Sequence, residues 1–403
     1  MQNVRWKWAG VALAAVAAVI LAAGGAPTKK PPKKKKTSGQ EIDNAIAAGL
    51  DWLHRHIEKP GGRWSATGFS KKCEIKDEKK DKPCSNAANM QGGQYDTGIT
   101  ALAVMAFLGN NYCRMDVPYG MSALQGIGHL KGRVGNNGAI GSQSDEKWMY
   151  NQLIATQALC EAYILTRTDS VEIAAKKAVK FILDAQNPGS GWGYKPKDGK
   201  PNTSVTAWAL CALHAAKQAG FNVPWAVFRG GLAGFAQMRP PTSGVIVSTA
   251  TGGDRTNRKN DDPKTPFRKL HTVSAAAAYA VICAGKKKSD SKFKRAVGII
   301  IRDTPEWLVT KEDCPINFYY WYFATNAMYR AGSSKWKKWK KPLHETLVGS
   351  QCTSGCARGS WDPAGEWCSA GGRVYATAMA VLALQTSYRH TLIEKYAKRL
   401  QGK

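Results

Sequence analysis

The chain has 403 residues and a formal net charge of +29, from 58 Lys and Arg against 29 Asp and Glu. Its composition, 43% hydrophobic and 22% charged, is that of a soluble globular protein and does not suit a chain that is disordered throughout. So much positive charge attracts polyanions, and we expect an anionic polymer or an anionic membrane surface as a partner. A basic surface with no specific anion is the plainer alternative. We do not expect a nucleic acid partner, and no pattern identifies a protein partner.

The N-terminus has the pattern of a targeting segment. Arg5 and Lys7 precede an uncharged stretch over residues 8–26, which is rich in Ala, Val and Leu. This pattern over residues 1–26 predicts a signal peptide or a signal anchor, and the length suits either. We therefore expect an extracytoplasmic protein, periplasmic or secreted, that residues 8–26 could anchor. The Lys run that follows argues the other way, because dense positive charge tends to stay cytoplasmic.

Residues 27–39 form a Lys/Pro-rich linker with too little apolar content to fold, and one folded domain is expected over residues 40–403. The spacing of apolar residues predicts six helix pairs in this domain, and no segment alternates as a strand would. In each pair the first helix is amphipathic and the second is apolar nearly all round. This pattern favours two concentric rings, with the apolar helices inside. The predicted helices cover residues 42–56 and 95–108, residues 121–165, residues 174–185 and 204–219, residues 225–237 and a helix from near 271, residues 293–301 and 318–329, and residues 343–351 and 374–388.

One Thr or Ser recurs near the start of each apolar helix, at the period of roughly 50 residues that stacked or ring-forming repeats show. The plainest interpretation is a hydroxyl that bonds back to a carbonyl of its own helix at a crowded contact. The six residues are Thr100, Thr156, Thr206, Ser274, Thr325 and Thr377.

A Gly/Trp turn follows the first helix in three of the units. Residues 177–186 with the turn at 189–193 resemble the Gln/Trp repeat of the squalene-cyclase and prenyltransferase superfamily, as do residues 347–351 with 359–361. Residues 49–64 give a third copy, with Ile57 in place of Gln. The resemblance covers about residues 40–390 and implies an all-α fold, an α/α toroid of about six helix pairs. It also implies that a set of repeat residues ties each outer helix end to the next repeat: Trp64, Gln186, Trp192, Gln351 and Trp361.

The C-terminal half is similar to uncharacterised bacterial proteins of this superfamily that are exported or membrane-linked. Catalytic motifs of the better-known members are missing. The cyclases protonate an alkene with an Asp-rich D-x-D-D motif, which this sequence lacks. Its one pair of adjacent aspartates is Asp261 with Asp262, in the basic loop 251–269. Neighbouring Arg and Lys would keep those carboxylates ionised, which does not suit a proton donor. The Asp-x-Cys zinc pattern of prenyltransferases is also absent, as are G-x-S-x-G and H-E-x-x-H.

Ten cysteines beside an export signal predict disulfides. Cys73 and Cys84 flank a charged loop and are expected to pair. A zinc site at a later cysteine cluster, with Cys314 or His344 as fourth ligand, is the alternative. We favour disulfides and predict neither a metal nor a cofactor. The disulfide candidates are Cys73, Cys84, Cys314, Cys352, Cys356 and Cys368.

In a toroid, the starts of the inner helices line one mouth of a central cavity. The residues there make a polar and aromatic ring that suits a ligand with an apolar part and a polar group, such as an isoprenoid or other lipid. The plainer explanation is that they cap helices and pack the core. The candidates are Asp96, Gln152, Asn202, His271, Tyr320, Tyr322, Arg373 and Tyr375.

These observations favour an exported ligand-binding or scaffold protein over an enzyme. The first alternative is a terpenoid cyclase-like or prenyltransferase-like enzyme with a relocated acid. The second is a protein that binds or processes an acidic polysaccharide, for which the interleaved Trp and Lys of residues 335–341 give local support. That segment also suits the start of an amphipathic helix.

Overall fold

The computed structural model describes residues 37–73, 83–87, 89–239, 246, 271–310 and 313–402. The N-terminal targeting pattern, most of the Lys/Pro linker and the Asp261–Asp262 pair lie outside these residues. Within them the chain forms α-helices, one 3-10 helix (η1, Phe69–Lys72) and no strand. In the described ranges no helix combines the length and the apolar character that crossing a bilayer requires.

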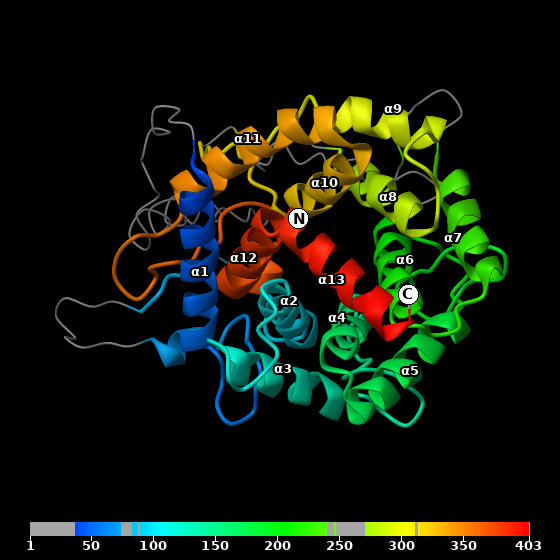
Figure 1. Cartoon of the computed structure of the whole chain (residues 1–403), viewed down its shortest axis with the longest axis horizontal. Helices are drawn as coiled ribbons and strands as arrows, with labels where there is room; N and C mark the ends of the chain where they lie inside the picture. Colours follow the sequence, from blue (N-terminus) through cyan, green and yellow to red (C-terminus); the bar gives the residue numbers. More distant parts are fainter. Residues whose placement is uncertain are drawn as a thin grey trace, which may run out of the picture.

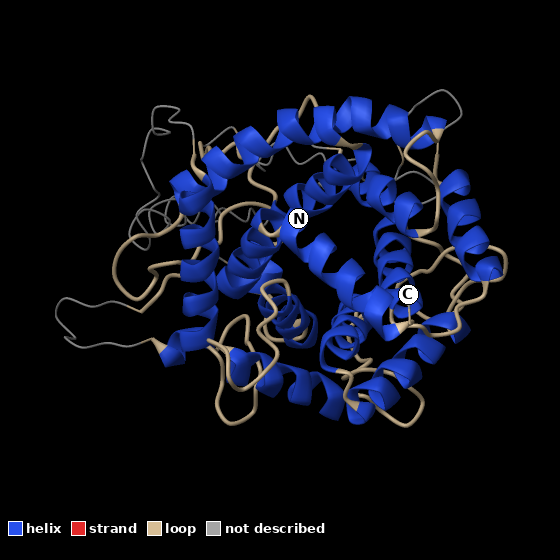
Figure 2. Cartoon of the chain, viewed as in Figure 1, coloured by secondary structure: helices blue, strands red, loops and turns tan. Residues whose placement is uncertain are grey.

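Twelve of the helices form two concentric rings (Figures 1 and 2). Each inner helix packs against the next, and α12 packs against α2, so the inner ring closes on itself. The predicted α/α toroid of six helix pairs is confirmed. The outer helices are α1 (Gly39–Arg55), α3 (Gly120–Gly132), α5 (Asp169–Asp184), α7 (Trp225–Gln237), α9 (Ser291–Ile300) and α11 (Ser333–Ser350). The inner helices are α2 (Asp96–Leu108), α4 (Met149–Thr166), α6 (Thr203–Gln218), α8 (Thr272–Cys283), α10 (Phe318–Ala331) and α12 (Cys368–Leu384).

The two rings follow from the two kinds of helix. All residues of α2 are buried, because it is enclosed by inner neighbours on both sides and by the outer ring. The outer helix α1 buries one stripe, which includes Ile42, Ile46 and Leu53, and Ser38 caps its start in a capping box with Glu41. Alanine-rich inner helices such as α8 let their neighbours approach closely.

A thirteenth helix, α13 (Thr386–Leu400), crosses one end of the inner ring and packs on α4, α6, α10 and α12 (Figure 1). The sequence predicted a single last helix to residue 388, but α12 ends at Leu384 and the chain turns at Gln385. The buried amide of Gln385 donates to the Ala106 carbonyl (2.9 Å) and to Asn110 Oδ1 (2.9 Å), which fixes the turn. Among the described residues, α13 thus covers the end of the ring where the inner helices finish.

Two histidines lie where α13 packs on the inner ring: His214 of α6, which is half-buried, and His390 of α13 itself, which is buried. His214 Nδ1 is 3.1 Å from the Cys283 carbonyl, and His390 Nε2 is 2.7 Å from Asn326 Oδ1. Burial and the nearby Arg330 lower the pKa of His214 to about 4, and burial lowers the pKa of His390 well below its usual 6.5. Both imidazoles are therefore neutral in the folded protein at neutral pH.

We expect this burial to make folding sensitive to mild acid. Below pH 6.5 the unfolded chain binds protons that folded His214 does not accept until about pH 4, so stability falls as pH drops through this window. Urea unfolding at pH 7 and pH 5 should show a smaller loss of stability for His214→Asn than for the wild-type chain. Equal losses in the two proteins would contradict this account.

The recurring hydroxyls hold the Gly/Trp turns against the inner ring. Thr206 Oγ1 accepts the Trp192 N–H (3.0 Å) and donates to the Trp192 carbonyl (3.2 Å), and Thr100 makes the same pair of bonds with Trp64 (3.0 and 3.3 Å). Only Thr156, among these three, donates to its own helix, to the Gln152 carbonyl (2.7 Å). The predicted back-bonding is thus right for Thr156 and wrong for Thr100 and Thr206, because the hydroxyl is used by the incoming turn.

The remaining three members of the set also accept bonds from other segments. The Trp361 N–H donates to Thr377 (3.3 Å), the Trp339 indole N–H to Thr325 (2.9 Å), and the backbone N–H of residue 246 to Ser274 (3.1 Å). In five of the six units the recurring hydroxyl therefore accepts a bond from another segment, which is a non-helical segment in four units and the outer helix α11 at Thr325.

Gln186 and Gln351 link neighbouring units, whereas each repeat Trp ties its turn to the outer helix of its own unit. The Trp192 indole N–H donates to the Ile182 carbonyl (2.8 Å), and Gln186 Nε2 donates to the Val227 carbonyl of α7 (2.9 Å). Gln351 Nε2 makes the corresponding bond to the Ala45 carbonyl of α1 (2.8 Å), which joins the last unit to the first. Like Trp192, Trp64 and Trp361 donate their indole N–H groups to the outer helix of their own unit, at the carbonyls of Leu53 and Leu347 (2.8 Å each).

Candidate functional site

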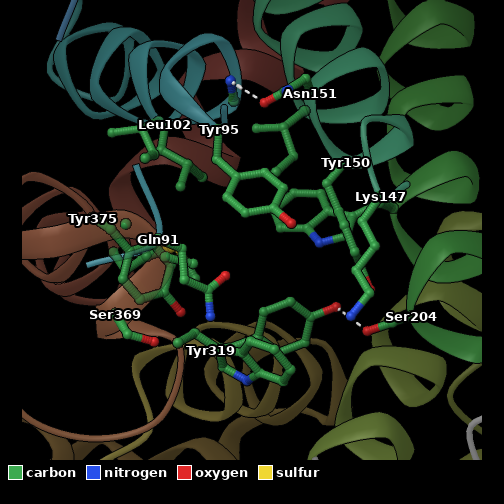
Figure 3. A pocket seen from close by; sticks show the side chains of 18 of the residues that line it. Gln91, Tyr95, Leu102, Lys147, Tyr150, Asn151, Ser204, Tyr319, Ser369 and Tyr375 are labelled. Carbon is green, nitrogen blue, oxygen red and sulfur yellow. Dashed lines mark hydrogen bonds between the residues drawn. The ribbon is translucent and has the colours of Figure 1, made fainter. Parts of the chain in front are cut away.

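A cavity of about 300 Å³ opens where the inner helices begin, at the end opposite α13 (Figure 3). Its walls come from the first turns of α2, α4, α6, α10 and α12 and from the loops before α2, α4 and α12. Most of the wall is apolar or aromatic. The aromatic side chains are Tyr95, Tyr150, Trp208, Tyr319, Trp367 and Tyr375.

Contacts behind the wall hold the aromatic rings in place. Trp208 stacks on Tyr322, with ring centroids 5.7 Å apart, and meets the edge of Tyr319 at 6.3 Å. The hydroxyls of Tyr319 and Ser204 are 2.6 Å apart, which joins α10 to α6 across the mouth (Figure 3). A preorganised wall of this kind costs a ligand little ordering entropy when it binds.

Three polar groups in this wall lack a hydrogen-bond partner among the described residues: the indole N–H groups of Trp208 and Trp367 and the Tyr375 hydroxyl. Leaving such a buried group unpaired costs about 1–3 kcal/mol, so buried polar groups are usually satisfied by protein, water or ligand. The wall thus retains hydrogen-bonding capacity beside its apolar surface.

Lys147 and Glu366 are the two charged side chains among the described residues that line the cavity. Lys147 lies over the ring of Tyr194, with Nζ 5.7 Å from its centroid, and its side chain extends along the cavity toward Ser204 (Figure 3). Glu366 is 8% exposed and accepts a hydrogen bond from Asn317 Nδ2 (2.9 Å). The cavity therefore combines a long apolar surface with one cation and one carboxylate.

Of the eight residues that the sequence proposed for this mouth, Tyr375 lines the cavity. Tyr322 lies one layer behind it, against Trp208. Asp96 accepts the Ala66 N–H (2.8 Å) and lies 3.7 Å from Arg63, so it caps a turn; burial raises the pKa of its carboxyl. It does not line the cavity.

The other five serve as caps and braces. Asn202 is the N-cap of α6 and accepts the N–H groups of the next turn, while His271 precedes α8. Gln152 accepts the Ile140 N–H (2.7 Å), and the Tyr320 hydroxyl donates to carbonyls at the end of α9. Arg373 bonds to Ser85, Ser360 and Asp362, which braces the loops around α12.

The sequence did not identify most of the actual wall. Tyr95 directly precedes Asp96, and Tyr150 lies two positions before Gln152. The predicted residues Asp96 and Gln152 are thus in the correct helical turns but do not face the cavity. Tyr150 and Tyr319 each lie six positions before the recurring hydroxyl of their unit, Thr156 and Thr325, and this recurrence was the available signal. Residues that recur at helical spacing, such as Tyr95, Gly98, Ile99 and Leu102, share the cavity face.

All ten cysteines have free thiols, so the predicted disulfides are not formed in this structure. Cys352 donates to Asp362 Oδ1 (3.4 Å) and Cys368 to the Ala364 carbonyl (3.2 Å). Cys356 instead lies with Cys73 and Cys84, so the later cysteines do not form one cluster.

No family model matches the chain, and no curated protein matches it. Solved structures with the same fold are enzymes of low sequence identity. An unsaturated glucuronyl hydrolase from Streptococcus agalactiae is 12% identical, with 89% of this chain and 96% of that one covered and a TM-score of 0.58. An α-1,6-mannanase of Salegentibacter, in complex with α-1,6-mannotriose, is 9% identical over 86% and 99%, with a TM-score of 0.56.

A type II terpene cyclase from Scytonema, in complex with geranylgeranyl dihydroxybenzoate, is 12% identical over 87% of this chain and 98% of that one, with a TM-score of 0.53. Identities at this level establish the α/α-toroid fold. They do not separate the terpenoid branch from the glycoside-hydrolysing one, since both share the architecture.

Proposed function

We propose that this protein binds an amphipathic ligand, an isoprenoid or similar lipid with a small anionic head, in the cavity at the mouth of the inner ring. The observation that carries the proposal is the lining itself, an aromatic and aliphatic wall with a single lysine beside it. The apolar chain would lie between Ile99, Trp208 and Met379, and the head group would meet Lys147. Binding, with no chemical step, is the function proposed.

The similar structures support ligand binding without choosing the ligand. The Scytonema cyclase holds an apolar terpenoid substrate, and the Salegentibacter mannanase holds a sugar chain. The lining favours the first kind of ligand, because hydrolysis of a glycosidic bond usually employs two carboxylates that flank the bond. Among the described lining residues Glu366 is the one carboxylate.

A second candidate function is an enzyme that uses Glu366 as its acid. The supporting observation is a nearly buried carboxyl group in an aromatic cavity. The two functions are distinguished by Glu366→Gln, which would abolish turnover of a bound isoprenoid but leave its binding intact. If every isoprenoid that binds the wild-type chain is recovered chemically unchanged, the protein is a binding protein and not an enzyme.

The binding proposal predicts that filling the cavity removes the ligand. Ala370 lines the cavity and is half-buried, so Ala370→Phe adds a ring to open space with little disturbance of the core. We expect at least a tenfold weaker affinity, about 1.4 kcal/mol, for farnesyl phosphate in a tryptophan-fluorescence titration. The unfolding midpoint should stay near that of the wild type.

The same titration tests whether Lys147 recognises the negative charge of the head group. Lys147→Gln should weaken farnesyl phosphate about tenfold and leave uncharged farnesol unaffected, because it removes one charge-assisted contact. The exposed Lys180→Gln is the matched control and should change neither affinity. Failure of both probes to bind, with saturable binding of a uronic acid oligosaccharide instead, would replace this proposal with the acidic-polysaccharide alternative.

A further inference from the structure

One cluster of metal-binding side chains lies outside the cavity. His56, Cys73, Cys84 and Cys356 place one imidazole nitrogen and three sulfurs within 4.8 Å of one another. His56 Nε2 is 3.6 Å from Cys73 Sγ, 3.8 Å from Cys84 Sγ and 3.4 Å from Cys356 Sγ. Ligand atoms of a tetrahedral zinc ion, with zinc–sulfur bonds of 2.3 Å, lie about 3.5–3.8 Å apart. The observed spacing is therefore close to that of a tetrahedral site.

The imidazole of His56 is held in the orientation that a ligand needs. Its Nδ1 lies 2.8 Å from the Trp52 carbonyl, which can only accept, so Nδ1 carries the proton and Nε2 presents its lone pair to the sulfurs. The ring is fully buried and stacks on Trp52, with centroids 4.2 Å apart. A backbone carbonyl on the distal nitrogen is the usual outer contact of a metal-bound histidine.

The sulfurs have outer contacts of the same kind. The backbone N–H of Cys84 donates to Cys73 Sγ (3.2 Å), a bond that stabilises a thiolate. Arg55 donates to the Cys356 carbonyl (3.1 Å), and Arg373 donates to the Ser85 carbonyl (2.8 Å), so a guanidinium secures each of the two loops. These cations also offset the net charge of −1 that three thiolates around Zn²⁺ would have.

We propose that His56, Cys73, Cys84 and Cys356 bind one zinc ion that holds the first and last units of the ring together. Three sulfurs and one imidazole in a tetrahedral arrangement suit zinc among the common metals. Four protein ligands leave no open position for substrate, so the site is structural. Binding of the zinc ion deprotonates the three thiols and releases their protons to solvent.

The site lies where the ring closes. His56 follows α1, Cys73 follows η1 and Cys84 precedes α2. Cys356 lies between α11 and α12, 300 positions from His56. The zinc ion would reinforce the Gln351–Ala45 bond, which joins the same two units. None of the four ligands lines the cavity, so this proposal stands independently of the proposed function.

The test uses the full chain, purified without chelators from cells grown with zinc. Elemental analysis should find about one zinc per chain after dialysis, since a site with four protein ligands holds its ion tightly. Exchange with Co²⁺ should give the intense visible bands of a tetrahedral thiolate site, a signature that needs no variant. Cys356→Ser should lose most of the zinc and unfold at a lower temperature.

Cys113→Ser is the matched control, because Cys113 is also a buried thiol but contacts Asn111 instead of the cluster. It should retain both the zinc and the cobalt spectrum. A wild-type chain without zinc whose mass shows a Cys73–Cys84 disulfide would overturn the proposal. So would zinc retained in full by both Cys356→Ser and Cys84→Ser. If Cys356→Ser does not fold, the cobalt spectrum of the wild type decides.

Discussion

Replacing Glu161 with Ala is expected to lower the free energy of unfolding by about 3–5 kcal/mol, because the guanidinium of Arg389 is then buried without its charge partner. The two side chains form an ion pair between α4 and α13 and are 4% and 5% exposed. Gln157 Nε2 donates to the same Glu161 oxygen (2.9 Å), so the substitution also leaves this amide without its acceptor. The pair fastens α13 across the closed end of the ring, and its loss should loosen that helix first.

Equilibrium unfolding in urea measures the effect. Asp184→Ala is the control, since it breaks the exposed Lys180–Asp184 pair and should cost no more than about 0.5 kcal/mol. Replacing Glu161 and Arg389 together by Met and Leu should recover most of the loss, because no charge is then left buried. A Glu161→Ala chain within about 1 kcal/mol of the wild type would show that the pair contributes little.

The second large effect is expected at the hydroxyl that anchors a Gly/Trp turn. Thr206→Val keeps the shape of the side chain but leaves the Trp192 N–H buried without a partner, and we expect a loss of about 2–4 kcal/mol. The Trp192 carbonyl loses one of its two bonds and keeps the one from the Asn202 N–H (2.8 Å). The turn stays in place because the buried Trp192 indole N–H still donates to the Ile182 carbonyl (2.8 Å).

Two substitutions separate this anchor from ordinary back-bonding. Thr206→Ser keeps the hydroxyl and should be much closer to the wild type than Thr206→Val. Thr391→Val removes a hydroxyl that bonds only to its own helix, at the exposed Ser387 carbonyl, and should stay within about 0.5 kcal/mol. If Thr206→Val is as mild as Thr391→Val, the recurring hydroxyls do not hold the turns.

The fold could be predicted from sequence because each repeat carries its own pattern. Apolar inner helices and amphipathic outer ones recur six times, and Gly/Trp turns separate several of them. The predicted bounds of the helices were wrong where that pattern is weak. The sequence started an outer helix at residue 343, yet α11 begins at Ser333 and contains Pro342. Its buried stripe of Trp339, Leu343 and Leu347 is interrupted by lysines, which hid the first turns.

The interleaved Trp and Lys of residues 335–341 thus form the start of an amphipathic helix. Trp339 is fully buried there and donates to Thr325. This is the plainer of the two interpretations that the sequence allowed.

The cavity was predicted at the correct end of the ring but not on the correct faces. Successive residues of a helix point about 100° apart, so Asp96 caps a turn while its neighbour Tyr95 lines the cavity. A sequence pattern does not fix that phase when a helix is apolar all round. Contacts between distant repeats are hidden for a different reason. Nothing near His56 indicates that Cys356 closes around it, because the ring geometry alone brings them together.

The central claim is that the cavity holds an amphipathic ligand in the native protein. Native mass spectrometry of the chain, purified without detergent from its own cells and followed by lipid extraction, tests it most directly. We expect a co-purifying isoprenoid or similar lipid in the wild type and its absence from Ala370→Phe purified in the same way. An unliganded mass in the wild type that stays unliganded when farnesyl phosphate is added would contradict the claim.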